Sequence, residues 1–186
     1  MGFKIIVGIK HYEEGEEQHI YKARGCATGN WVQDIFGHQV FEDDLFGRPV
    51  AMTGARVVMA QTLLKGGDLE QADANNAYCQ AKLKGPQKWL KLPKHLWPAE
   101  WSGMKCPVIP LERALYGLVR SNFDWNDHCD SKLLGAGWRR CWSGEKFIYD
   151  KTFCGSRVKL VVYVDDFVAG GKDDARAAAW VELREL

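Results

Sequence analysis

At 186 residues, with 46% hydrophobic and 26% charged side chains, the chain is long enough and apolar enough to fold around its own core. This composition excludes a disordered protein, and no apolar run reaches the length needed to span a membrane. The formal net charge of +1 does not by itself indicate a nucleic-acid partner, so that question depends on where the charges lie along the chain.

The six cysteines argue against a zinc site. They are widely spaced, with no Cys-x-x-Cys pair and no paired histidines. The opening residues Met1–Ile6 are too short and too soon charged for a secretory signal peptide. We therefore expect an intracellular protein whose thiols are reduced.

The first third of the chain predicts a β-hairpin followed by a helix. Phe3–Ile9 and His19–Lys22 flank an acidic, turn-forming segment. After a glycine-rich irregular stretch, Met52–Lys65 has the composition of a helix. Thr53 is its expected N-cap, and the two glycines directly after the helix are its expected stop.

A strand, a basic segment and a second helix are expected next. Leu69–Asp73 has the length of a short strand, and Ala77–Leu83 predicts one or two helical turns. Gln87–Trp101 is rich in tryptophan and interrupted by prolines, which favours loops and short strands. Apolar residues recur at nearly helical spacing over Leu111–Leu134, with a break near Ser121.

The stretch from residue 82 to 113 is basic although the whole chain is nearly neutral. Such a stretch forms a footprint for a phosphate backbone, and an ordinary solvated surface is the alternative interpretation. The lysines that we expect to contact nucleic acid are Lys82, Lys84, Lys88 and Lys91.

The last third predicts strands and a closing helix. Phe147–Tyr149 and Val158–Val164 have strand composition, with a turn expected over Asp150–Arg157. Asp173 is the expected cap of a helix over Ala175–Leu186. The order of these elements predicts an α+β fold around an antiparallel sheet, because it lacks the regular βαβ alternation of a parallel one.

Two adjacent carboxylates, Asp165 and Asp166, interrupt an apolar run. Burying them as ions would be costly unless a cation or hydrogen bonds compensate. Neighbouring side chains on a regular strand face opposite ways, so we place the pair at the tip of a tight hairpin between Val158–Val164 and Phe167–Ala169. An acidic surface turn is the alternative, and the apolar flanks favour a divalent-cation site.

A third carboxylate, Asp73, ends the short strand predicted earlier in the chain. An aspartate in that position is often a cap or turn former. Together with Tyr-Val-Asp-Asp on a hairpin, however, it matches the palm site of template-directed polymerases. Their chemistry uses two Mg²⁺ ions about 3.5–4 Å apart to activate a primer 3′-hydroxyl and stabilise the leaving pyrophosphate. Mg²⁺ prefers oxygen ligands, which explains the need for carboxylates.

The chain resembles the reverse transcriptase of copia-type long-terminal-repeat retrotransposons from about Tyr21 to Gly171. The matching motifs occur in the family's order and are Tyr21-Lys-Ala-Arg24, Pro49-Val-Ala51, Gln71-x-Asp73 with Ala77-Tyr78, Arg113-Ala-Leu-Tyr-Gly-Leu118 with Trp125, Gly137-Trp138 and Tyr163-Val-Asp-Asp166. Tyr-Val-Asp-Asp alone is a moderate signal, and the Ala-Leu-Tyr-Gly-Leu block upstream of it makes the resemblance specific.

The resemblance implies a single α+β domain of the polymerase palm-and-fingers type, with an antiparallel palm sheet, packed helices and no thumb. Residues 1–67 would be fingers-like and residues 68–186 mainly palm. It also implies an RNA-directed DNA polymerase that transfers nucleotides from dNTPs to a primer on an RNA or DNA template. Two Mg²⁺ ions would serve it, with Mn²⁺ as a substitute.

The resemblance further implies a set of metal ligands. Asp73 and Asp165 would be the main ligands, Asp166 would complete the carboxylate set, and Ala74 would offer its carbonyl. The rest of a polyprotein, including RNase H and integrase, or a second subunit, would be partners. A cytoplasmic virus-like particle or the nucleus would be the location.

A second set of residues would hold the nucleotide. By the resemblance, Tyr78 would lie under the incoming sugar and exclude a 2′-hydroxyl, and Tyr116 with Gly117 would line the nucleotide and template pocket, where glycine permits close backbone approach. Lys22 and Arg24 would belong to the fingers and meet the triphosphate or template. Core packing for the tyrosines and simple solvation for the cations are the alternatives.

Two other functions stay open. Residues 119–123 depart from the family pattern, and this favours a catalytically inactive retroelement relic that folds and binds nucleic acid through its basic, tryptophan-containing segment. A palm-like nucleotidyl cyclase would also use paired acids on a hairpin, but it would not carry the Ala-Leu-Tyr-Gly-Leu block. A P-loop enzyme is excluded because Gly170-Gly-Lys172 lacks the earlier glycine and a following Ser or Thr.

Overall fold

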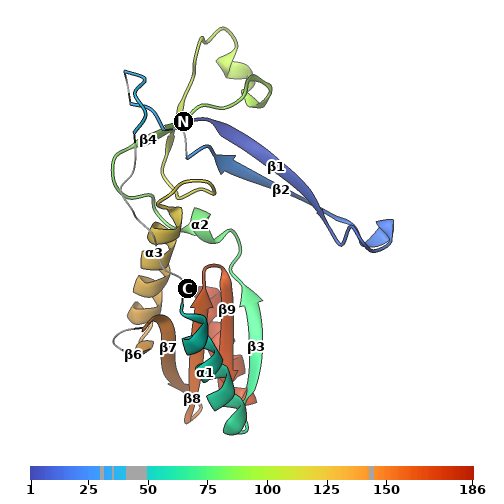
Figure 1. The fold of residues 1–186 in the computed structure, drawn as a ribbon, viewed down its shortest axis with the longest axis vertical. Coiled ribbons are helices and arrows are strands. Elements are labelled where there is room, and N and C mark those ends of the chain that lie inside the picture. The colour runs from blue at the N-terminus through green and yellow to red at the C-terminus, as the bar shows by residue number, and fades with distance from the viewer. Residues whose placement is uncertain (30–31, 35, 41–49, 143–144) are drawn as a thin grey trace. The chain divides into compact units, whose positions relative to one another are not determined.

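The computed structural model describes residues 1–186 apart from 30–31, 35, 41–49 and 143–144 (Figure 1). The chain divides into two compact units, each made of two segments. Met1–Phe46 and Tyr78–Asp124 form the hairpin unit, and Gly47–Ala77 and Trp125–Leu186 form the sheet unit. The division thus differs from a single cut near residue 67, because the chain returns to the hairpin unit after contributing a helix and a strand to the sheet unit.

The sheet unit contains a five-stranded sheet in the order β3-β9-β8-β7-β6, with every neighbouring pair antiparallel. The strands are β3 (Asp68–Asp73), β6 (Arg139–Trp142), β7 (Glu145–Phe153), β8 (Ser156–Tyr163) and β9 (Asp166–Gly171). The central strand β8 is apolar on both faces. Val158, Leu160 and Val162 are buried on one face and Val161 is buried on the other.

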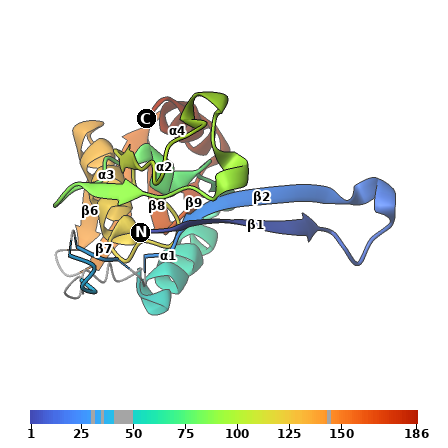
Figure 2. The same cartoon turned by 90° about the horizontal axis from the view of Figure 1, so that it is seen from above.

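Helices on both faces of the sheet explain this two-sided apolar pattern. Helix α1 (Met52–Leu64) lies on the face that carries Lys159, whose Nζ donates a hydrogen bond to Gln61 Oε1 in the helix. Helix α4 (Asp173–Glu185) lies on the opposite face, where Arg176 bonds to β3. Figure 2 shows α1 and α4 on either side of β8 and β9.

The part of helix α3 (Ser121–Gly135) that belongs to the sheet unit shares a face with α4. The buried Tyr149 hydroxyl on β7 donates to Asp130 Oδ1 of α3 at 2.8 Å. After α3, the indole Nε1 of Trp138 donates to Glu182 Oε1 of α4, also at 2.8 Å. These two bonds tie both helices to the same side of the sheet.

The hairpin unit is named for the long antiparallel pair β1 (Phe3–Lys10) and β2 (Ile20–Ala27), which projects from the rest of the unit in Figures 1 and 2. Its other elements are short. They are α2 (Ala77–Gln80) from Tyr78 on, β4 (Lys88–Leu90), β5 (Ile109–Leu111) and the 3₁₀ turns at Glu16–Gln18, Lys94–Leu96 and Ala99–Trp101. Ala27, Leu90 and Leu118 form its small core, so most of β1 and β2 is exposed.

The predicted helix after residue 51 is confirmed, but two predicted caps are wrong. The N-cap of α1 is Ala51 rather than Thr53, and the N-cap of α4 is Lys172 rather than Asp173; neither uses a side-chain cap. Both helices begin one or two residues earlier than a side-chain cap would place them. Gly66 follows α1 with φ +69°, and this stop was predicted.

The predicted helix over Leu111–Leu134 is wrong in its first half. Leu111 ends β5, and α3 begins at Ser121, where a break was expected. Gly117 has φ +90°, which ends any helical path through this segment. The turn expected over Asp150–Arg157 is much shorter, because β7 and β8 join through Cys154 and Gly155 alone.

Among the described residues, no helix is both long enough and apolar enough to cross a membrane. All six cysteines lie in the described part of the chain, and all are free thiols. Burial raises the pKa of the Cys129 thiol to about 12, with a smaller contribution from Asp130. This thiol is therefore protonated and inert at neutral pH.

Candidate active site

The turn between β8 and β9 is the centre of the site. Tyr163 pairs with Asp166, so only Val164 and Asp165 form the loop. The predicted tight hairpin is confirmed, but only Asp165 is at its tip, since Asp166 is already the first residue of β9. Val164 has φ +58° and Asp165 does not have a positive φ, a pattern that fits a type II′ turn with valine where glycine is usual.

A β-branched residue with positive φ is strained, at a cost of order 1–3 kcal/mol. Two hydrogen bonds from outside the hairpin hold this turn. The backbone N–H of Ala74 donates to the Asp165 carbonyl at 2.7 Å. The indole Nε1 of Trp125, on α3, donates to the Val164 carbonyl at 2.6 Å.

Strand pairing brings the third aspartate to the same place. Asp73 is the last residue of β3 and stands directly opposite Asp166 in the antiparallel register. Directly opposite residues share a face, so both side chains project from the same side of the sheet. Gln71, two residues before Asp73 on that face, donates from Nε2 to Asp166 Oδ1 at 3.0 Å.

The surroundings of Asp166 raise the pKa of its carboxyl. Partial burial is the largest cause; the Asp73 carboxyl raises the pKa as well, and Asp165 adds to this. The hydrogen bond from Gln71 acts in the opposite direction. Carboxylates in such proximity repel each other when ionised, and a cation between them removes the repulsion.

This donor set fits a hard divalent cation. Among the residues that the structure describes, no three Asp, Glu, His or Cys side chains converge as a ready-made metal cluster. Asp73 and Asp166 are nevertheless neighbours with a raised pKa on one of them, and Asp165 follows in the adjoining turn. Ala74 uses its N–H to hold the turn, and its carbonyl remains the predicted ligand.

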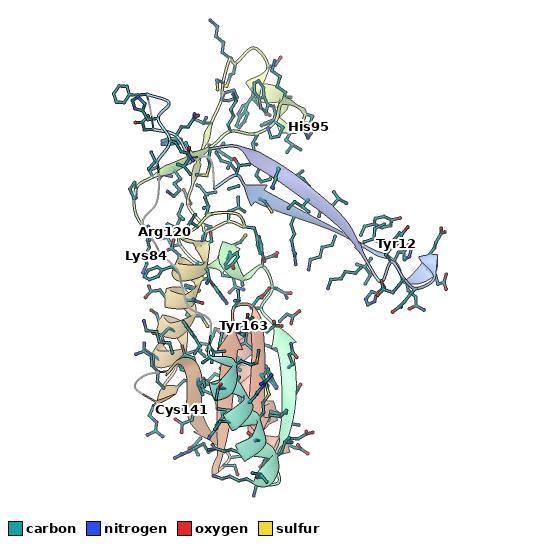
Figure 3. The ribbon with its side chains drawn as sticks, in the orientation of Figure 1. Tyr12, Lys84, His95, Arg120, Cys141 and Tyr163 are labelled. Atoms are coloured by element: carbon teal, nitrogen blue, oxygen red, sulfur yellow. The ribbon has the colours of Figure 1, made fainter. Side chains whose placement is uncertain are left out.

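The end of the sheet that carries the aspartates is open to solvent on their face. Tyr163, which shares this face with Asp166, is 44% exposed, and both Gln71 and Asp73 are exposed. On this face, Gln61 of helix α1 accepts a hydrogen bond from Lys159, four residues before Tyr163 in β8. Figure 3 shows Tyr163 at the upper end of the β8–β9 hairpin.

The predicted nucleotide-binding residues gather in the hairpin unit. The rings of Tyr78 and Tyr116 lie 4.8 Å apart, and the Arg24 guanidinium lies 5.6 Å from the centre of the Tyr116 ring. Gly117, next to Tyr116 in the chain, has φ +90°, and a side chain there would collide with the carbonyl of Ala27. These residues form an aromatic and cationic cluster with a backbone that only glycine allows.

The register of β1 and β2 places Lys22 and Arg24 in a larger cationic face. Lys22 and Arg24 share one face of the hairpin with Lys4 and Lys10, one cation at each of four successive cross-strand pairs. All four side chains are exposed, and no acidic residue lies on this face. Successive cations are about 6.7 Å apart along the hairpin, two residues of strand.

The opposite face of the same hairpin carries no charge. Its large side chains are Phe3, Ile5, Val7, Ile9 and Tyr21, and all of them except Phe3 are exposed. The two faces of one ribbon thus differ in charge, although the cationic face also exposes Ile6 and Ile20. Only the cationic face offers positively charged side chains to phosphate.

The four lysines predicted to contact nucleic acid differ in their exposure to solvent. Lys82, Lys84 and Lys91 are exposed, but Lys88 is only 7% exposed because it lies on the inner face of β4. Lys88 therefore has little surface to offer to a phosphate backbone. Nearby, Lys94 lies over the ring of Trp97, which packs edge-on against Trp101.

The predicted site residues thus fall into two sets. The sheet unit holds the four predicted metal ligands, and the hairpin unit holds the predicted nucleotide and nucleic-acid residues. Sequence reasoning gave no role to Gln71, Trp125, Lys4 or Lys10. The two-residue spacing from Gln71 to Asp73 was a usable signal, since it places both on one face of a strand. Nothing local in the sequence indicated that Trp125 reaches the turn.

The chain is similar to polyproteins of transposable elements. It is 27% identical over 132 residues to the retrovirus-related Pol polyprotein from transposon TNT 1-94 of Nicotiana tabacum, covering 70% of this chain and 10% of that protein. It is 30% identical over 153 residues to the transposon Ty1-DR5 Gag-Pol polyprotein of Saccharomyces cerevisiae, covering 82% of this chain and 8% of that protein. The Ty1-LR2 Gag-Pol polyprotein matches equally.

No protein-family model matches the chain, and no solved structure matches it. The chain spans no more than about a tenth of the length of the curated relatives. It is a relative of retrotransposon polyproteins, matching one segment of them.

Proposed function

We propose that this chain is the reverse transcriptase segment of a copia-type retrotransposon, an RNA-directed DNA polymerase. The observation that carries the proposal is the pairing of Asp73 with Asp166 beside the strained turn that holds Asp165. The similarity to Pol and Gag-Pol polyproteins supports it, because it indicates a retroelement origin. The exposure of Tyr163, Gln71 and Asp73 supports it as well, since a substrate has to reach the aspartates from solvent.

The three aspartates have the roles of metal ligands in this proposal. Asp73 and Asp165 are the main ligands, Asp166 completes the set, and the Ala74 carbonyl adds a neutral oxygen. When bound, two Mg²⁺ ions, or Mn²⁺ in their place, supply the charge that activates a primer 3′-hydroxyl and stabilises the leaving pyrophosphate. The chain itself holds the carboxylates in register, and the Gln71 amide orients that of Asp166.

The hairpin unit has the binding roles. Tyr78 and Tyr116 offer ring faces to the sugar and base of a dNTP, and Arg24 and Lys22 offer charge to its triphosphate or to the template. Lys82, Lys84 and Lys91 extend the contact with template or primer phosphates. The remaining partners are those of a polyprotein, RNase H and integrase, or a second subunit.

The test is extension of a DNA primer on an RNA template in the presence of Mg²⁺. We expect extension by the wild type and its loss in Asp165→Asn, with both proteins folded by circular dichroism. Asp68→Asn is the matched control, because Asp68 lies at the far end of β3, opposite Gly171. Loss of extension in both variants would contradict the assignment of the site.

A relic that folds and binds nucleic acid without catalysis is the second candidate. The observation in its favour is Arg120, which lies in the segment that departs from the family pattern and is held by Asp124. This candidate predicts salt-sensitive binding of the same primer–template by a folded wild type that gives no extension. Primer extension by the wild type would rule out this second candidate.

A further inference from the structure

The catalytic turn is held at both of its carbonyls by donors from outside the hairpin. The Asp165 carbonyl accepts from the Ala74 N–H at the end of β3, and the Val164 carbonyl accepts from the Trp125 indole at 2.6 Å. The first bond comes from the strand that carries Asp73. The second comes from a helix that carries no proposed catalytic group, so it needs its own explanation.

The position of Trp125 is rigidly set. Its side chain is 3% exposed, and its ring lies 5.9 Å from that of His128, one helical turn further along α3. The helix is fixed to the sheet by Asp130, which accepts from the buried Tyr149 hydroxyl and also pairs with Arg140. The indole N–H thus reaches the turn from helix α3, whose attachment to the sheet through Asp130 does not involve the turn.

We propose that Trp125 is a positioning residue for the catalytic turn, holding Val164 in its positive-φ conformation. Valine disfavours this conformation, and a free two-residue loop with valine would relax out of it. Relaxation rotates the peptide planes on both sides of Asp165 and disturbs the register that sets Asp73 against Asp166. The effect of Trp125 on catalysis rests on the proposed polymerase function, whereas its effect on the conformation of the turn does not.

The experiment compares Trp125→Phe with Trp138→Phe by amide hydrogen exchange. Each change keeps a buried aromatic ring and removes one indole hydrogen bond, to Val164 in the first case and to Glu182 in the second. The reporter is the Ala74 amide, since its acceptor lies inside the turn. The amide of Leu160, in the central strand, reports global unfolding and corrects for any shared loss of stability.

We expect Ala74 to exchange about tenfold faster in Trp125→Phe than in Trp138→Phe after this correction, the size expected for one lost hydrogen bond. Equal exchange at Ala74 in the two variants would overturn the proposal. A second variant, Val164→Gly, removes the need for a clamp, because glycine adopts positive φ freely. In that background Trp125→Phe should change Ala74 exchange little, and an undiminished effect would also overturn the proposal.

Primer extension supplies the catalytic readout. Trp125→Phe should lower kcat with little change in KM for the dNTP, and Trp138→Phe should leave both near wild type. If the wild type does not extend primers, the proposed function is wrong. The hydrogen-exchange comparison still tests the positioning role of Trp125, because it does not depend on polymerase activity. If extension occurs and Ala74 exchange is unaffected by Trp125→Phe, the positioning role alone is rejected.

Discussion

Asp166 lies beside other carboxylates of the site. It faces Asp73 across a strand pair, and like charges directly opposite each other in a sheet are destabilising by about 0.2–1 kcal/mol. Its pKa is raised by partial burial and by the neighbouring carboxyls. The stability contributed by its protonated form is therefore fully present below the ordinary carboxyl pKa of 3.8 and is lost as pH rises through the raised folded value.

Asp166→Asn should consequently raise the free energy of unfolding at neutral pH in the absence of Mg²⁺, by up to about 1 kcal/mol. The amide keeps an acceptor for Gln71 and removes the charge. Below the ordinary carboxyl pKa of 3.8, where this contribution is fully present, the two proteins should be equally stable. Urea unfolding at both pH values checks this.

Mg²⁺ should stabilise the wild type more than Asp166→Asn, because in the wild type the cation also offsets a repulsion that the variant no longer has. Asp68→Asn, on the same strand but opposite Gly171, is the control and should respond to Mg²⁺ as the wild type does. If Asp166→Asn were less stable than the wild type in the absence of Mg²⁺, the Asp166 carboxylate would not be under repulsion.

The sequence predicted the placement of single residues where that placement depends on their immediate neighbours in the chain. An Asp-Asp pair inside an apolar run has few low-energy placements, and a tight hairpin is one of them. The burial of Lys88 could not be foreseen, because it depends on which face of a three-residue strand meets the rest of its unit. The contact of Trp125 with Val164 depends in the same way on how α3 lies against the sheet.

At the scale of elements, the start of α3 depends on a buried ion pair. The Asp124 carboxylate, fully buried, accepts from Arg120 Nε at 2.9 Å and from the Lys84 backbone N–H at 3.1 Å. It also lies in the first turn of α3, where the helix dipole favours negative charge. Figure 3 shows Lys84 and Arg120 close together beside this turn.

Asp124→Ala should lower the free energy of unfolding by about 3–5 kcal/mol, because it removes the buried carboxylate that pairs with the largely buried Arg120. Replacing both residues together, as Arg120→Met with Asp124→Leu, should cost much less, since no buried charge remains. Denaturant unfolding of the two proteins provides the comparison. A single variant within about 1 kcal/mol of the wild type would mean that water already compensates this pair.

The same element shows why sequence periodicity has limits. Apolar spacing continued from Leu111 to Leu134, yet the helix begins only at Ser121, because periodicity does not register the positive φ that Gly117 requires. Thr53 and Asp173 were predicted as caps from residue type alone, and each helix instead begins without a side-chain cap. Helix cores were thus predictable, whereas their ends depended on backbone geometry.

At the scale of the whole molecule, a net charge of +1 conceals strong segregation of charge. Composition alone gave no indication of nucleic acid, and the basic stretch over residues 82–113 was visible along the chain. The cationic face of β1 and β2 was not, because Lys4, Lys10, Lys22 and Arg24 come together only through strand register. The division into two units was also hidden, since each unit is assembled from two separate segments.

The cationic face makes a quantitative prediction about salt. For single-stranded nucleic acid, the slope of log K against log salt concentration changes by about 0.7 for each phosphate contact. Lys4→Gln with Lys10→Gln should therefore make the slope shallower by about 1.4 and weaken binding at low salt. Filter binding or fluorescence anisotropy with a single-stranded RNA over a range of salt concentrations measures it.

Lys132→Gln with Lys172→Gln is the matched control, since both lysines are exposed and belong to the sheet unit. It removes the same net charge from the molecule but none from the cationic face. An equal change of slope in both double variants would mean that overall charge, and not this face, drives binding. A change confined to Lys4 and Lys10 would place single-stranded nucleic acid along the hairpin, on residues that only the register of β1 and β2 identifies.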